Sequence, residues 1–128
     1  MTSMKNIAAL LFLLFSFVCD AQQFSVSYSS KDFKGPFSGK IYLYLSKEDK
    51  NPRAYNNIGL SSFPCFAISV KNIMPGAKVV VDDKAISFPV KLSDIERGEY
   101  YVQAVWDRNL GGRSIGNCPG NIYNKSVK

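Results

Sequence analysis

The most informative absence in this sequence is histidine. The 128 residues contain no histidine and only three cysteines. Imidazole is the usual general base and a frequent zinc ligand, so a Ser-His-Asp triad, a Cys-His pair and a His-containing zinc site are all excluded within this chain. The length also allows one domain of ordinary size and excludes a two-domain enzyme. We therefore expect no catalytic residues, no metal site and no cofactor.

The chain also lacks an apolar run long enough to cross a bilayer. Residues 7–18 are apolar with one exception and follow a lysine. A spanning helix needs about 20 such residues, whereas the apolar part of a signal peptide needs about 7–15. Cys19 and Ala21 place small residues at the −3 and −1 positions of a cleavage site. We predict a cleavable signal peptide at residues 1–21 and an exported mature chain at 22–128 with no transmembrane helix. A lipid anchor at Cys19 is the weaker alternative.

Positive charge is present but not clustered. Lys and Arg number 16 against 10 Asp and Glu, which gives a net charge of +6. The basic residues are spread over the expected turns, without a run of three. A nucleic-acid-binding protein gathers them on one face, together with aromatic residues. We expect no nucleic-acid partner. We interpret the positive charges as residues that keep the protein soluble and protect the sheet edges from pairing with other chains.

Sustained helical periodicity is absent after residue 22, and short alternating runs take its place. Apolar and polar residues alternate in several of these runs, and clusters rich in Gly, Pro, Asn and Asp separate them. The pattern predicts an all-β, antiparallel, immunoglobulin-like sandwich of about seven strands. Pro89 marks its strand as an edge or a bulge. The expected strands cover residues 24–28, 41–45, 63–70, 78–81, 86–90 and 100–106, and a last strand opens at 126–128.

The longest alternation begins at Tyr100 and ends at Trp106. A turn containing Gly98 comes just before it. In immunoglobulin-like sandwiches a tyrosine at this place often forms a tyrosine corner, in which its hydroxyl bonds back to the preceding turn. We favour this structural role for Tyr100 over simple packing on the core. Trp106 would close the core at the other end of the strand.

The mature chain keeps two cysteines, Cys65 in an apolar run and Cys118 in a loop. An exported protein can join two such residues in a disulfide. The spacing does not decide between a Cys65–Cys118 disulfide and two reduced thiols.

Several tyrosines are candidates for ligand binding. Tyr42 and Tyr44 lie on the face of their expected strand opposite Ile41 and Leu43, and Tyr55 lies in a loop. Exposed aromatic rings can stack on sugars, so these tyrosines could bind a polysaccharide. The alternative is ordinary packing of the second sheet face, or an interface with a following domain.

Three stretches of the chain carry a resemblance to known proteins: residues 98–116 (GEYYVQAVWDRNLGGRSIG), 35–46 (GPFSGKIYLYLS) and 63–67 (FPCFA). They are similar to the N-terminal region of large secreted esterase-like proteins of Bacteroidetes-type bacteria. In those proteins the region looks like an immunoglobulin-like domain ahead of an α/β-hydrolase domain. The resemblance covers most of the mature chain and implies a non-catalytic accessory domain, which packs on, or recruits substrate to, a C-terminal hydrolase domain absent from this chain. A free-standing carbohydrate-binding module is the alternative function.

One motif suggests an enzyme. Residues 112–116 match the G-x-S-x-G pattern, with Ser114 in the place of the nucleophile. That chemistry needs a tight turn from a strand into a helix, a histidine base and an acid. Pro119 and Gly120 follow instead of a helix-forming sequence, and no histidine is present. We interpret the motif as a glycine-rich loop, and the resemblance places the serine of any parent hydrolase beyond residue 128.

Overall fold

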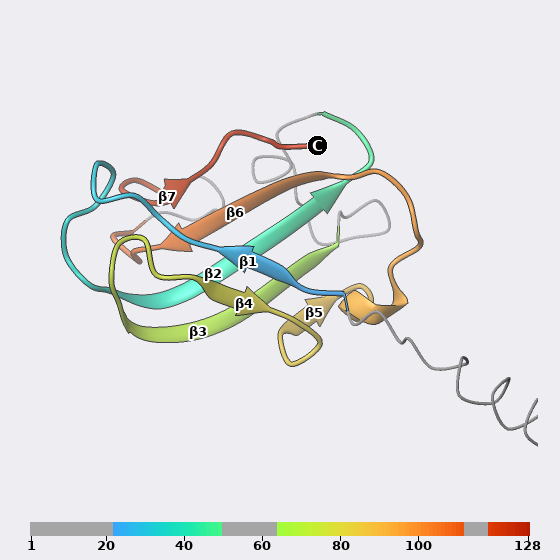
Figure 1. The fold of residues 1–128 in the computed structure, drawn as a ribbon, viewed down its shortest axis with the longest axis horizontal. Coiled ribbons are helices and arrows are strands. Elements are labelled where there is room, and N and C mark those ends of the chain that lie inside the picture. The colour runs from blue at the N-terminus through green and yellow to red at the C-terminus, as the bar shows by residue number, and fades with distance from the viewer. Residues whose placement is uncertain (1–21, 50–63, 112–117) are drawn as a thin grey trace, which may run out of the picture.

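The computed structural model describes residues 22–49, 64–111 and 118–128. The expected leader at 1–21 lies outside these residues. Within them the regular elements are strands and one short 3-10 turn, so the all-β prediction is confirmed (Figure 1). The strands are β1 (Phe24–Val26), β2 (Phe37–Ser46), β3 (Cys65–Ile73), β4 (Val79–Val81), β5 (Ile86–Phe88), β6 (Tyr101–Asp107) and β7 (Ile122–Tyr123), and the 3-10 turn η1 spans Leu92–Asp94.

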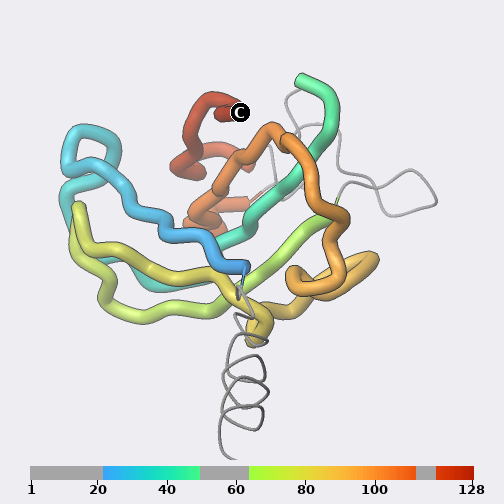
Figure 2. Tube along the Cα trace, turned by 45° about the vertical axis from the view of Figure 1, so that its right-hand side comes forward, coloured from blue at the N-terminus to red at the C-terminus, as the bar shows by residue number. Residues whose placement is uncertain are grey.

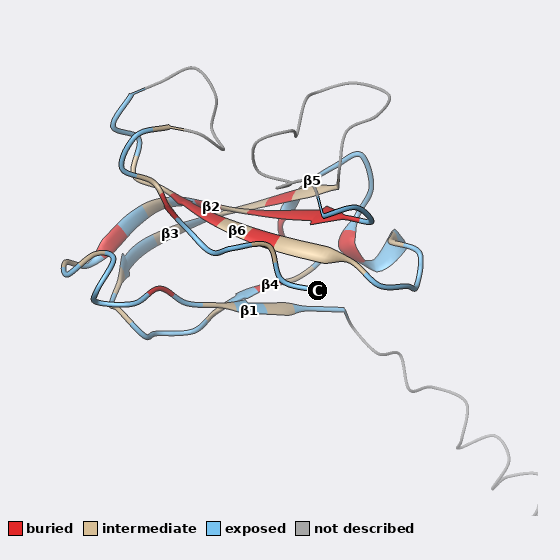
Figure 3. Cartoon of the chain, turned by 90° about the horizontal axis from the view of Figure 1, so that it is seen from above, coloured by how far each residue is buried: buried red, intermediate tan, exposed pale blue. Residues whose placement is uncertain are grey.

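The strands form two antiparallel sheets of unequal size. One has two strands in the order β1-β4, and the other has five in the order β5-β3-β2-β6-β7. Seen from above, they form two layers, with β1 and β4 in the narrower one (Figure 3). The predicted sandwich is confirmed at this level. The strand β5 is an edge of the larger sheet, as the proline at position 89 predicted.

The last strand differs from its prediction. We expected it to open at residue 126, but β7 forms earlier, at Ile122–Tyr123, and pairs with Val105 and Trp106. Further along, Val127 makes a single bridge with Val102. Between these two pairings, the side chain of Asn124 takes the place of a partner strand's main chain. It accepts a hydrogen bond from the amide of Ala104 and donates one to the carbonyl of Val102. An asparagine that replaces backbone bonding in this way gives no alternating signal in the sequence.

Alternation along the strands places one face of the larger sheet against the smaller sheet. Ile41, Leu43 and Leu45 of β2 point inward and are at most 1% exposed. Phe66 of β3 and Val81 of β4 pack in the same layer. At about 25 cal/mol per Å² of apolar surface, such burial is the main stabilising contribution to a sandwich of this size.

Trp106 lies at the centre of an aromatic cluster at one end of this layer. Its ring centroid is 4.9 Å from that of Tyr28 and 5.1 Å from that of Phe37, both in edge-to-face arrangements. Such pairs add to the hydrophobic effect because the positive edge of one ring meets the negative face of another. The Tyr28 hydroxyl lies 2.7 Å from the carbonyl oxygens of both Gly35 and Ile73, so its polar end is satisfied. The cluster fixes the chain segment after β1 against the larger sheet.

The smaller sheet covers only part of the larger one. Phe24 and Val26 of β1 pack on the buried residues of β2 and β3, and β4 also contacts β3. In Figure 2 the orange trace that contains β6 lies between the blue β1 segment and the red C-terminal segment. The side of β1 that faces away from β4 has no neighbouring strand in the described part of the chain. This uneven coverage leaves a cleft between β1 and the larger sheet.

Candidate functional site

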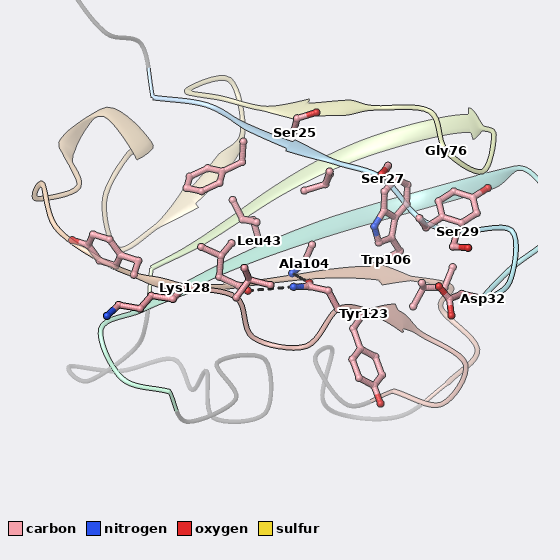
Figure 4. Close-up of a pocket in the computed structure, with 18 of the residues that line it drawn as sticks. Ser25, Ser27, Ser29, Asp32, Leu43, Gly76, Ala104, Trp106, Tyr123 and Lys128 are labelled. Atoms are coloured by element: carbon pink, nitrogen blue, oxygen red, sulfur yellow. Dashed lines mark hydrogen bonds between the residues drawn. The ribbon is translucent and has the colours of Figure 1, made fainter.

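An open cleft of about 1310 Å³ separates β1 from β6 and the C-terminal segment (Figure 4). The chain at residues 24–29 forms one wall. Leu43, Val102, Ala104 and Trp106 form the floor, and the opposite wall consists of Ile122, Tyr123, Asn124 and Val127. Most of this lining is apolar. Alternation along β6 makes the floor of the cleft apolar. In the described part of the chain, the main-chain groups that border the cleft are unpaired on β1 but bonded on β6.

The floor of the cleft comes from the alternation of β6. Tyr100, Val102, Ala104 and Trp106 share one face, as the sequence predicted, and all four line the cleft. Trp106 is buried at 2% exposure, whereas Val102 and Ala104 are only half-buried. The smaller sheet does not reach over these two side chains. An apolar surface that would be core in a closed sandwich is therefore partly open to solvent.

The β1 wall presents a free main-chain edge. The amide of Gly76 donates to the carbonyl of Tyr28 at 2.8 Å, so this carbonyl points toward the β4 side. Main-chain groups of successive residues in a strand point to opposite sides. Those of Phe24 and Val26 therefore point to β4, and those of Ser25 and Ser27 point into the cleft. The described residues supply no backbone partner on that side of β1.

The edge of β6 on the other side is already satisfied. The Ala104 amide donates to Asn124 Oδ1 at 2.6 Å, and Asn124 Nδ2 donates to the Val102 carbonyl at 3.3 Å. The Val102 amide and the Val127 carbonyl add a bond of 2.7 Å. β6 therefore offers no open edge on this side. β7 is an edge strand as well but has only two residues, so the longer edge beside the cleft is that of β1.

Charge is confined to the two ends of the cleft. Asp32 lies at one end, and Glu99 and Lys128 form an ion pair of 3.0 Å at the other. The remaining described lining residues are neutral, although the chain carries a net charge of +6. A ligand that fits this cleft is therefore uncharged along its middle.

Tyr100 holds the Glu99 end of the cleft. Its hydroxyl donates to the carbonyl of Glu96 at 2.7 Å, which is the contact that defines a tyrosine corner. Lys47 Nζ lies 5.8 Å above the Tyr100 ring and 3.0 Å from Glu96 Oε2. The hydrogen bond with Glu96 raises the pKa of Lys47 above its ordinary value. Together these contacts fix the turn that leads into β6.

The other candidate face lies on the outer side of the larger sheet. The rings of Tyr42 and Tyr44 are stacked there, with centroids 6.4 Å apart and planes 17° apart. Tyr44 is only 4% exposed, and burial raises the pKa of its hydroxyl. Burial withdraws the Tyr44 ring from solvent, so it offers no stacking surface to a sugar. Tyr42 is half-buried, and Tyr55 lies outside the described residues.

Cys65 is next to Tyr44 on this outer face, because the two residues are cross-strand partners in β2 and β3. The thiol and the Tyr44 hydroxyl share a hydrogen bond, and burial raises the pKa of Cys65 to about 12. No disulfide joins Cys65 to Cys118 in the described structure, so the pairing that the sequence left open is not formed here. Ser114 lies outside the described residues.

Over residues 22–49, 64–111 and 118–128, no three His, Cys, Asp or Glu side chains come together as a metal site would require. No helix in that part of the chain is long and apolar enough to cross a membrane.

Reasoning from the sequence missed the cleft. It identified the alternating faces of 24–28 and 100–106 but did not indicate an open space between them. A signal was available at residues 24–29, which contain none of the lysine, proline or inward charge that usually protects a sheet edge. Sequence alternation alone does not indicate how many strands cover a sheet.

Comparisons with known proteins gave no match. No family model, no curated protein and no solved structure matches this chain. The resemblance to esterase-associated domains stays a prediction.

Proposed function

We propose that this chain is a non-catalytic accessory domain of an exported protein and that it packs against another polypeptide through the cleft. The observation that carries the proposal is the half-buried apolar floor formed by Val102 and Ala104 beside an unpaired strand edge. A contiguous apolar surface left open between two sheets is typical of a site for protein contact.

The size and lining of the cleft favour a polypeptide over a small molecule. Small-molecule sites usually enclose about 300–1,000 Å³ and carry several polar groups that converge on the ligand. This cleft measures about 1310 Å³, and its charged groups lie at its ends. An open and mostly apolar cleft of this size matches an interface with another chain segment or domain better than a small-molecule pocket.

The resemblance of the sequence suggests the identity of the partner. If the chain shares the architecture of secreted esterase-like proteins, the neighbour is an α/β-hydrolase domain that acts on carboxylic esters. The accessory domain would orient that domain or bring substrate to it, and the chemistry would take place in the hydrolase.

Hydrolysis of p-nitrophenyl acetate tests the non-catalytic part of the proposal. We expect the purified exported chain to give no turnover above buffer. The Ser114→Ala variant is the matched control, because Ser114 is the nucleophile that a hydrolase reading would require. Turnover by the parent chain that disappears in this variant would show that the domain is itself an esterase.

A carbohydrate-binding module is the second candidate, and the buried ring of Tyr44 weakens it. Retention of the chain on a panel of insoluble polysaccharides tests this candidate. Retention that is lost in Tyr42→Ala and Tyr55→Ala variants would favour it over the accessory domain. We expect no retention.

A further inference from the structure

We propose that the cleft receives one extended strand from the partner polypeptide, and that this strand pairs with the free edge of β1. The inference rests on the proposed function and specifies how the partner binds. Strand addition to an exposed sheet edge is a general mode of peptide recognition, in which main-chain bonds supply affinity and alternate side chains fill pockets.

The wall formed by β1 carries hydrogen-bonding groups for such a strand. The main-chain groups of Ser25 and Ser27 point into the cleft, as the bond from the Gly76 amide to the Tyr28 carbonyl indicates. On the far side of the cleft, Asn124 bonds to the main chain of β6, and the edge strand β7 has only two residues. An incoming strand would therefore form its ladder with β1.

The floor provides the side-chain contacts. In an inserted strand every second side chain points to the floor, where the half-buried Val102 and Ala104 lie, while Val127, at 57% exposure, contacts the strand from the far wall. Covering these side chains would complete the apolar layer. The strand must therefore carry apolar residues at alternate positions.

Charge sets a second requirement for the occupant. The described lining is neutral between Asp32 at one end and the Glu99–Lys128 pair at the other. Burial of an unpaired charge over this floor would be costly. The segment that fits is uncharged in the middle, and its charged residues lie beyond the two ends of the cleft.

The described part of the chain leaves no strand for this edge. Every strand in residues 22–49, 64–111 and 118–128 already belongs to one of the two sheets, so none of them is left to pair along β1 on the cleft side. The strand that we propose there comes from another polypeptide.

A synthetic peptide tests this inference on the purified exported chain. The probe is a blocked heptapeptide of alternating valine and threonine, and its binding is followed by NMR titration. We expect saturable binding, with amide exchange at Ser25 and Ser27 slowed in the complex. A version of the peptide N-methylated on its backbone keeps every side chain but loses its donors, and we expect it to bind at least about tenfold more weakly.

Variants of the protein locate the site. Ala104→Glu places a charge on the floor, and we expect at least about a tenfold loss of affinity for the probe. Val80→Glu is the matched control, because Val80 is 47% exposed on β4 and is absent from the cleft lining. It should bind the probe like the parent chain. The N-methylated peptide is measured on the parent chain, so the inference can still be tested if Ala104→Glu fails to fold.

Three outcomes would overturn strand addition. Equal binding of the probe and its N-methylated version would show contact through side chains alone, and the proposed polypeptide-binding function would stand. Protection of Ser25 and Ser27 without peptide, together with a dimer in sedimentation, would assign the edge to a second copy of this chain. Absence of any binding would remove the inference, and the p-nitrophenyl acetate and polysaccharide results would decide the proposed function separately.

Discussion

The two halves of the sandwich follow the same strand pattern but are covered to different extents. In the closed half, represented by Leu45, Phe66 and Val81, the inward side chains are at most 1% exposed. In the open half, represented by Val102 and Val127 beside the cleft, the equivalent side chains remain partly in solvent. The difference comes from the width of the smaller sheet, which has two strands over a sheet of five. Alternation sets the direction in which a side chain points, and the number of covering strands sets how deeply it is buried.

The largest expected effect compares direct neighbours across the two halves. Leu45 and Val102 are cross-strand partners on the same face of β2 and β6, but Leu45 is buried and Val102 lines the cleft. We expect Leu45→Ala to lower the free energy of unfolding by about 3 kcal/mol and Val102→Ala by about 1 kcal/mol. Urea unfolding measures both values. The carbons removed differ in number, so the costs are compared per carbon. Equal costs per carbon would mean that the open half is as tightly covered as the closed half.

The next effect concerns the corner that holds the open half in place. Tyr100→Phe removes the hydroxyl that bonds to the Glu96 carbonyl, and we expect it to cost about 1 kcal/mol in the same unfolding assay. Tyr101→Phe is the control, because no contact of the Tyr101 hydroxyl is found in the described structure and the loss should be within about 0.5 kcal/mol. An unchanged free energy of unfolding in Tyr100→Phe would show that the turn before β6 is held by packing alone.

Water should also be excluded from Cys65 and Tyr44, which lie on the outer side of the larger sheet behind the closed half. Burial raises the pKa of Cys65 from 9.0 to about 12. Between these values the unfolded chain loses the thiol proton while the folded chain keeps it, so stability falls as pH rises. We expect the free energy of unfolding to drop by about 1 kcal/mol between pH 8 and pH 10.

The control for this pH effect is Cys65→Ala, in which the drop should shrink, although the raised pKa of Tyr44 leaves a smaller loss of the same sign. Alkylation of Cys65 by iodoacetamide at pH 8, in a Cys118→Ser background, should be much slower in the folded than in the unfolded chain. A fast reaction of the folded chain would show that this face is open.

Much of the fold could be predicted from the sequence, and the candidate site could not. Alternation located β1 to β6 because inward and outward residues differ in polarity along each strand. It misplaced the last strand, because Asn124 replaces main-chain pairing with side-chain bonds. It also suggested Tyr44 as a sugar platform, since alternation assigns a residue to a face without indicating what covers that face. The cleft depends on which strands are neighbours in space, and that information is spread over the whole chain.

The smallest expected effect concerns Val127, at the edge of the open half. Its side chain is 57% exposed, and its contribution to the fold comes from two main-chain bonds with Val102. Val127→Ser keeps those bonds, so we expect the free energy of unfolding to change by less than about 0.5 kcal/mol. The same variant should weaken binding of the valine–threonine peptide several-fold, because an inserted strand would bury the side chain. A variant that alters binding without altering stability would show that the open half is built for a partner. A large loss of stability in the isolated chain would show instead that the cleft is already closed around Val127 in solution.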